Sequence, residues 1–141
     1  MGHRIALAII MLFLIAGCGG DTYESLSGVA ESGSPGDTVI LDEARVDTIR
    51  GITYTPQSDQ HFFAVYDKSS DPPEFIMIRV YDNYIDFDPK GGEFVFVRGR
   101  LEETPNIDMT DQENWNYYRE TGNSMNVVAT DVKEIDRPAG W

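Results

Sequence analysis

The sequence has little of what most catalytic and nucleic-acid-binding proteins depend on. Its 141 residues include one cysteine and two histidines, and eleven basic residues stand against 24 acidic ones. A lone cysteine excludes a disulfide framework, and a histidine-based zinc site lacks ligands. Phosphate binding along a nucleic acid needs clustered Lys and Arg, so no nucleic acid is expected as a partner. Nucleophile-elbow, Walker and dinucleotide motifs are also missing, and we expect neither enzymatic activity nor a cofactor.

Long hydrophobic runs are scarce as well. Residues 5–15 form the longest one, directly after Arg4, and these eleven residues are too few to cross a bilayer core about 30 Å thick. Their length and the preceding charge are typical of a signal peptide. Cys18 follows Leu14-Ile15-Ala16-Gly17. This pattern resembles the lipobox of bacterial lipoproteins, in which the cysteine is lipidated and becomes the first mature residue.

The lipoprotein resemblance implies a lipid bilayer partner through acylated Cys18. Such proteins carry a diacylglyceryl group on sulfur and often a third acyl chain on nitrogen, and stable anchoring needs at least two signals. Gly19 follows the cysteine. In lipoprotein sorting of the enterobacterial kind, the absence of aspartate there favours the outer membrane, facing the periplasm. An inner-membrane or Gram-positive cell-surface location stays open, as does a plain thiol after an ordinary signal peptide.

Composition divides the chain into three parts. Residues 1–17 are the expected signal peptide, 18–36 the lipidated cysteine and a Gly- and Ser-rich flexible tether, and 37–141 a single β-domain. Docking of residues 23–30 on that domain stays open. Removal of the signal peptide leaves 10 basic and 24 acidic residues, a charge of about −14. A domain this acidic is typically soluble and is repelled by anionic membrane surfaces.

The domain is expected to be mainly β. Five runs are rich in Val, Ile, Phe, Tyr and Thr and are separated by turn residues: 37–49, 61–66, 74–82, 93–103 and 125–135. Period-2 alternation places Ile76, Ile78 and Val80 on one face of the third run. In the fourth run it places Val95, Val97, Gly99 and Leu101 on one face, opposite Phe94, Phe96, Arg98 and Arg100. Gly99 predicts a bulge or tight bend, and aromatic residues on both faces predict that part of the outer face is covered.

The phrases GGEFVFVRGRLEE and NVVATDVKEI, within five strands of which the first is long, resemble an OB-fold. The resemblance covers residues 37–135 and implies a small five-stranded antiparallel barrel with one short helix. Thr110-Asp111-Gln112-Glu113 is a capping-box pattern, so we expect the helix after the fourth strand. The usual OB helix precedes the fourth strand, where residues 83–92 are too short for one. A small β-sandwich is the alternative architecture.

Few side chains suggest chemistry. His61 begins the second strand and is expected at the surface of a strand edge. Asp86 and Asp88 are weak candidates for a cation site, because Lys90 and Val97 occupy the fifth and twelfth positions of the calcium loop that they partly resemble. We therefore expect a solvated acidic turn there, and no metal. Paired carboxylates could hydrolyse a glycosidic bond, but that chemistry needs a cleft, which is not expected in so small a domain.

Aromatic residues in loops are the better candidates for binding. They are Tyr84, Phe87, Trp115, Tyr117 and Tyr118. Loops beside the barrel face form the usual binding surface of OB-folds, and aromatics next to acids suit a peptide, a sugar or a cation. A lid folded onto the barrel mouth is the alternative role. The sequence predicts a membrane-anchored, non-enzymatic interaction module with an envelope protein as partner, or alternatively a small-ligand or Ca²⁺-binding lipoprotein.

Overall fold

The computed structural model describes residues 20–47, 52–55, 60–85, 89–103 and 125–141. The elements of this part of the chain are β1 (Thr22–Tyr23), α2 (Leu26–Ser32), β2 (Thr38–Val46), β3 (Ile52–Thr55), β4 (Gln60–Tyr66), β5 (Phe75–Tyr81), β6 (Phe94–Glu103) and β7 (Met125–Ile135). All five predicted strands are present, as β2, β4, β5, β6 and β7. The bounds of the last four differ from the predicted ones by one residue at most.

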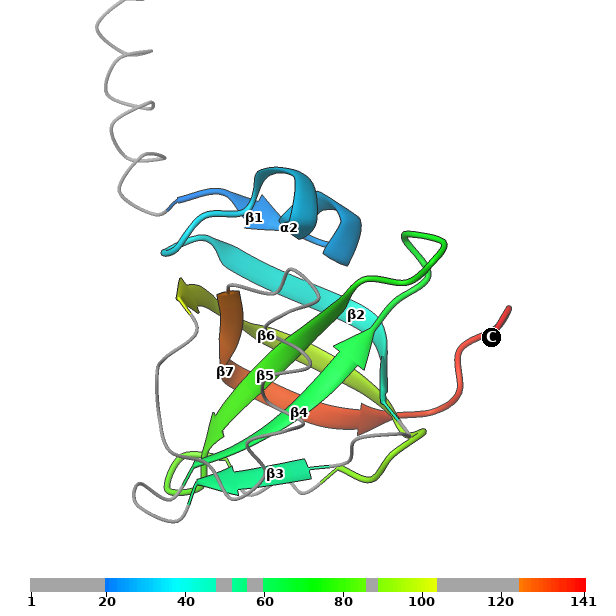
Figure 1. Ribbon diagram of the computed structural model, residues 1–141. Coiled ribbons are helices and arrows are strands. Elements are labelled where there is room, and N and C mark those ends of the chain that lie inside the picture. Colours follow the sequence, from blue (N-terminus) through cyan, green and yellow to red (C-terminus); the bar gives the residue numbers. More distant parts are fainter. Residues whose placement is uncertain (1–19, 48–51, 56–59, 86–88, 104–124) are drawn as a thin grey trace, which may run out of the picture.

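Five strands close into a small barrel (Figure 1). The pairing runs from β2 to β6, β7, β5 and β4, and the end of β2 pairs with β4, where Val46 faces Val65. This closure confirms the mainly β, OB-like barrel and excludes the sandwich. The short helix among the described residues is α2, which is not the one predicted after the fourth strand. One detail of the prediction was wrong. The barrel is mixed rather than antiparallel, because β5 and β7 run parallel, as do β1 and β2 outside the ring.

The core fills the inside of the barrel, as strand alternation predicts. Ile76, Ile78 and Val80 of β5 point into it, and they meet Val95, Val97 and Leu101 of β6. None of these six side chains is more than 3% exposed. Burial of such a side chain contributes roughly 1.5–3 kcal/mol, so the alternating positions of the strands supply most of the stabilisation.

A second, smaller apolar cluster lies on the other face of β4 and β5. It consists of Phe62, Ala64 and Met77, with Phe75 packed against it. Phe62 and Ala64 are fully buried. The expectation that part of the outer face is covered is therefore confirmed.

Gly99 marks an irregularity between β6 and β7, as the sequence predicts. The register shifts here, because Arg98 faces Asp131 while Gly99 faces Ala129, which leaves Thr130 as the extra residue on β7. A Cβ atom at Gly99 would lie 2.3 Å from the Val128 carbonyl oxygen. Only glycine lets the two backbones approach this closely.

Residues 20–36 are part of the fold, and the tether interpretation does not hold for them. β1 pairs with the start of β2, where Thr22 faces Thr38. Helix α2 covers one end of the barrel (Figure 1) and buries Leu26 and Val29, which are 2% and 4% exposed. Docking of residues 23–30, the alternative that the sequence left open, is what the structure shows.

Helix α2 is held at its first turn by three side-chain acceptors. Ser25 Oγ accepts from the Gly28 amide at 3.1 Å. Asp67 Oδ2, on the connection between β4 and β5, accepts from the Leu26 amide at 2.9 Å, and Ser69 Oγ accepts from the Ser27 amide at 3.0 Å. These bonds satisfy amides that have no partner within a helix, and they attach the helix to the barrel. The helix predicted around residues 110–113 lies outside the described residues.

Candidate functional site

Of the aromatic residues predicted to bind a partner, the described part of the chain contains Tyr84. Its side chain is 87% exposed, and no other large hydrophobic side chain among the described residues is classed as exposed. Phe87, Trp115, Tyr117 and Tyr118 lie outside the described residues, as do Asp86, Asp88 and Cys18. The structure therefore places one of the predicted binding residues, and places it at the surface.

A tight turn after β5 presents Tyr84. The amides of Tyr84 and Ile85 both donate to the Tyr81 carbonyl oxygen, at 3.0 Å and 3.2 Å. Ile85 packs against the barrel core. An apolar anchor on one side and an exposed phenol ring on the other give the turn a fixed orientation.

His61 and Asp82 join the base of this turn to β4. The two side chains are bonded through His61 Nδ1 and Asp82 Oδ1 at 2.5 Å. His61 is only 3% exposed and stacks on Phe63 with the ring centroids 6.2 Å apart. The expectation of a surface histidine was therefore wrong. His61 shares the inward face of β4 with Phe63 and Val65, and a buried imidazole needs the hydrogen bond that Asp82 provides.

Arg79 and Tyr81 lie on the outer side of β5, next to the turn that presents Tyr84. The Arg79 guanidinium lies over the Tyr81 ring, 5.1 Å from its centroid, and donates to the Tyr81 hydroxyl. It also lies 3.9 Å from a carboxylate oxygen of Glu102 on β6. We call Tyr81, Asp82 and Tyr84 the β5-end surface, and Arg79, whose side chain is only 14% exposed, supports it through Tyr81. Tyrosine is one of the residue types enriched in protein–protein hot spots.

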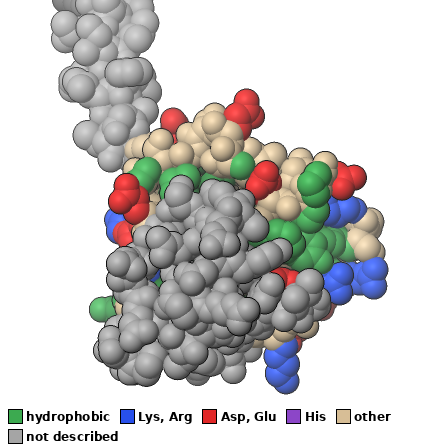
Figure 2. All heavy atoms as spheres, viewed as in Figure 1, with side chains coloured by type: hydrophobic (Ala, Val, Ile, Leu, Met, Phe, Trp, Pro, Cys, Tyr) green, Lys and Arg blue, Asp and Glu red, His purple; other side chains and the backbone are tan. Residues whose placement is uncertain are grey.

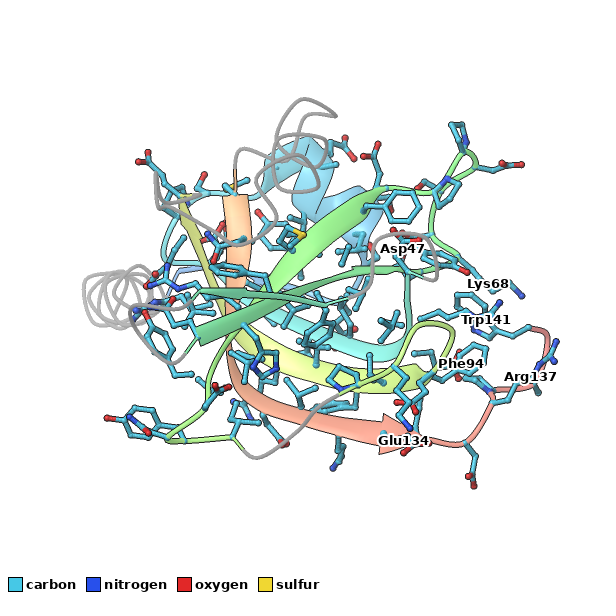
Figure 3. All side chains as sticks on the ribbon, turned by 60° about the horizontal axis from the view of Figure 1, so that its bottom comes forward. Asp47, Lys68, Phe94, Glu134, Arg137 and Trp141 are labelled. Carbon is cyan, nitrogen blue, oxygen red and sulfur yellow. The ribbon has the colours of Figure 1, made fainter. Side chains whose placement is uncertain are left out.

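A cluster around Trp141 was not foreseen from the sequence (Figure 3). The indole ring packs edge-on against Phe94 and at a tilt against Tyr66, with the ring centroids 5.1 Å and 5.8 Å apart. Lys68 Nζ lies 5.6 Å from the indole centroid. Arg137 donates to the Trp141 backbone oxygen. No periodic pattern signals these contacts, because they join residues from three separate parts of the chain.

A hollow of about 330 Å³ lies beside Trp141. It is lined by Glu24, Ser25, Leu41, Asp42, Glu43, Asp67, Lys68, Ser69 and Trp141. Four of these nine residues are acidic, but the face of the indole is already covered by the ammonium group of Lys68. The aromatic face that could hold a foreign cation is thus occupied by the chain's own cation.

Acidic side chains stand apart from one another on the face of the molecule that Figure 2 shows. Figure 2 shows Asp and Glu at separate places over the end of the molecule that carries β1 and α2. The described residues contain no group of three or more His, Cys, Asp or Glu side chains that could hold a metal ion. Within the same part of the chain, no helix combines the length and the apolar character needed to cross a bilayer.

Comparison of the sequence with models of known protein families and with curated proteins finds no match.

Proposed function

We propose that this protein is a lipid-anchored lipoprotein of the bacterial cell envelope, acylated at Cys18, whose OB-like domain binds another envelope protein without catalysing a reaction. The anchor is supported by Leu14-Ile15-Ala16-Gly17-Cys18 after a short apolar run. The outer membrane, facing the periplasm, is the location that Gly19 favours. The binding role rests on the β5-end surface.

The observation that carries the binding role is the exposure of Tyr84 on a fixed turn. At 87% exposure, most of the phenol ring is open to contact by a partner. Both backbone bonds to Tyr81 and the His61–Asp82 bond hold the turn in place before any partner arrives. A preorganised turn loses little backbone entropy on binding, so more of the contact energy of Tyr84 remains available as affinity.

The arrangement of the barrel suits a tethered binder. In Figure 1 the described chain enters at the top, beside β1, while β5 ends at the lower side of the barrel. A membrane anchor ahead of residue 20 would therefore hold one end of the domain and leave the turn after β5 facing away. This geometry lets a partner reach Tyr84 without contacting the membrane.

Photo-crosslinking in cells tests the binding role. A photoreactive phenylalanine at position 84 should give an adduct with one envelope protein, and the same group at the exposed position Lys90 should not. With that partner purified, Tyr84→Ala should weaken the complex at least about tenfold, as expected for a hot-spot tyrosine. The matched control is Asn83→Ala, on the same turn and also exposed. Equal affinity of the Tyr84→Ala protein and the control would refute the proposal.

The anchor has a separate test. Cys18→Ala should abolish labelling by a clickable palmitate analogue and should leave a soluble protein or an unprocessed precursor. If the variant stays membrane-bound and processed like the native protein, the lipoprotein assignment is wrong. Neither result depends on whether Tyr84 binds a partner.

A small-ligand or cation-binding lipoprotein is the second candidate, and the observation that favours it is the group of four acidic residues that line the hollow beside Trp141. Bound Ca²⁺ should raise the melting temperature in proportion to the logarithm of its concentration once the site is saturated. Asp86→Asn with Asp88→Asn would remove the effect if the acidic turn is the site, and Glu43→Gln would do so if the hollow is. No Ca²⁺-dependent stabilisation would exclude the calcium version.

A further inference from the structure

A second hollow, of about 320 Å³, lies on the outer face of β2, β6 and β7. It is lined by Thr38, Arg98, Gly99, Arg100, Val128 and Thr130. Both of its charged residues are arginines, although the chain as a whole carries a formal charge of −13. A hollow whose only charged lining residues are arginines favours an anionic ligand, even on a protein with this negative charge.

The two arginines are placed to act together. They alternate with Gly99 on β6, so both side chains lie on the outer face, and both are exposed. Their Cα atoms are about 7 Å apart, because a strand rises roughly 3.4 Å per residue. No ion pair within the described residues involves Arg98. Arg100 donates to Glu102 through Nη2 at 2.6 Å, and its guanidinium has further N–H groups to offer.

Neighbouring side chains complete the hollow. The Thr38 hydroxyl stands on β2 beside Arg100, its cross-strand partner. The Thr130 hydroxyl donates to the Arg98 carbonyl oxygen at 3.2 Å, which fixes the backbone where the register shifts. The hollow therefore offers two guanidinium groups and a hydroxyl on a rigid sheet. Guanidinium groups bind the oxygens of phosphate through paired, charge-assisted hydrogen bonds.

We propose that this hollow binds a phosphate group, and that in the tethered protein the group belongs to the headgroup of a zwitterionic phospholipid. The assignment to a headgroup rests on the proposed anchor at Cys18, whereas the phosphate site itself does not.

The position of the hollow supports a headgroup as the source. Cross-strand pairing places Thr22, Thr38 and Arg100 in one row on neighbouring strands. Two strand spacings of about 4.8 Å separate Thr22 from Arg100. Four residues at no more than about 3.6 Å each separate Thr22 from Cys18. The two spans add up to about 24 Å at most between Arg100 and the lipidated Cys18. This distance allows the hollow to reach the bilayer surface.

The charge of the rest of the domain determines which lipids fit. Glu102 lies against Arg100, and Asp131 faces Arg98 across the strands. A densely anionic surface would be repelled by these acids and by the net charge. A headgroup that pairs a phosphate with an ammonium group satisfies both signs, because the arginines can take the phosphate and the acids the amine.

Binding measurements on residues 20–141 test the site. The buried core residues that the structure describes all lie between Leu26 and Val132, so this fragment contains the whole of that core. NMR titration with inorganic phosphate should shift the amide signals of Gly99 and Arg100. Arg98→Ala and Arg100→Ala should each weaken phosphate binding roughly tenfold, since a hydrogen bond to a charged group is lost. Lys90→Ala removes the same charge outside the hollow and should leave the affinity within twofold.

A second arm identifies the source of the phosphate. The native fragment should sediment with phosphatidylethanolamine–phosphatidylcholine vesicles, and the fragment with both Arg98→Ala and Arg100→Ala should stay in solution. Adding phosphatidylglycerol to the vesicles should reduce the amount of native fragment that sediments. Phosphate binding without vesicle binding would overturn the headgroup and leave a site for soluble phosphate. Failure in both arms, or binding that the arginine variants do not change, would overturn the site. The fragment lacks Cys18, so none of these results bears on the anchor.

Discussion

His61 Nδ1 and Asp82 Oδ1 lie 2.5 Å apart, and their bond joins the start of β4 to the turn that presents Tyr84. An ionised carboxylate only accepts hydrogen bonds, so Nδ1 is the donor of this bond whenever Asp82 is ionised. The histidine is buried while the aspartate side chain is 42% exposed. Asp82 thus connects a buried polar group to the surface, and its loss would affect both stability and the presentation of Tyr84.

We expect Asp82→Ala to destabilise the fold by about 1–2 kcal/mol, because a buried imidazole N–H loses its acceptor. Water can reach the exposed side of the pair, which keeps the cost at the lower end of the usual range. Urea unfolding measures the change in the free energy of unfolding. Asn83→Ala, the neighbouring exposed position, serves as control. An equal cost for the two variants would mean that the His61–Asp82 bond is unimportant for stability.

Gly99→Ala should cost about 3 kcal/mol, at the upper end of the range for overpacking. The new methyl group would lie 2.3 Å from the Val128 carbonyl oxygen and 2.6 Å from Val127 Cγ1, and a backbone oxygen in a paired strand cannot move aside. Gly36→Ala is a matched control for steric contact, since a Cβ there meets nothing within 4 Å. Its positive φ of 97° still makes it mildly unfavourable. Thermal melting of both variants tests the ranking, which the reverse order would contradict.

The strands could be predicted because their information is local. Alternation in β5 and β6 identifies both the strands and their buried faces, and turn residues mark their ends. The irregularity at Gly99 could be predicted for the same reason, since a glycine inside an alternating run indicates a close approach of backbones. The parallel pairing of β5 with β7 has no local signal, because it depends on how the barrel closes.

The docking of residues 20–36 depends on partners far along the chain. Gly and Ser dominate this segment, and its apolar residues are few. Leu26 and Val29 are spaced as one face of a helix, a signal that the composition concealed. The acceptor that holds the helix is Asp67, 41 residues away from Leu26. A flexible tether and a docked helix therefore have nearly the same local sequence.

In the candidate site too, features with a local sequence signal could be predicted, and features that depend on distant residues could not. Tyr84 was predictable as an exposed aromatic in a turn between strands. The burial of His61 was not, because it follows from the inward face of β4 and from Asp82 across the strand pair. Trp141 gave no signal, since its contacts with Phe94 and Tyr66 form only in the folded chain.

Asp67→Ala should destabilise the protein by about 2–3 kcal/mol and release helix α2 before the barrel unfolds. The carboxylate is 8% exposed and accepts from the Leu26 amide and, through its other oxygen, from Ser69. Its removal leaves the buried Leu26 amide without an acceptor. Amide exchange of Leu26 and Val29 should speed up far more than that of β6. Asp42 is an exposed acid that lines the hollow beside Trp141 together with Asp67, and Asp42→Ala should change neither the stability nor the amide exchange of α2. Uniform acceleration in α2 and β6 would contradict a local role.

Tyr23 makes the docking of the N-terminal segment sensitive to alkaline pH. Its hydroxyl donates to the Ser32 carbonyl oxygen at 2.9 Å, and the ring packs on the core. Burial raises the pKa of this phenol above its ordinary value of 10.0, and the negative charges of Asp37 and Asp21 raise it further. The folded state therefore holds the proton more tightly than the unfolded state does.

The sign of the effect follows from that difference. The contribution of Tyr23 to stability is fully present below about pH 10 and is lost as the pH rises through the folded pKa. NMR signals of Leu26 and Val29 should report undocking of α2 in that window for the native protein. Tyr23→Phe has no proton to lose and should keep α2 docked to higher pH, while Asp21→Asn should move the pKa of Tyr23 back toward its ordinary value. Undocking of the native and Tyr23→Phe proteins at the same pH would show that the phenol does not control this step.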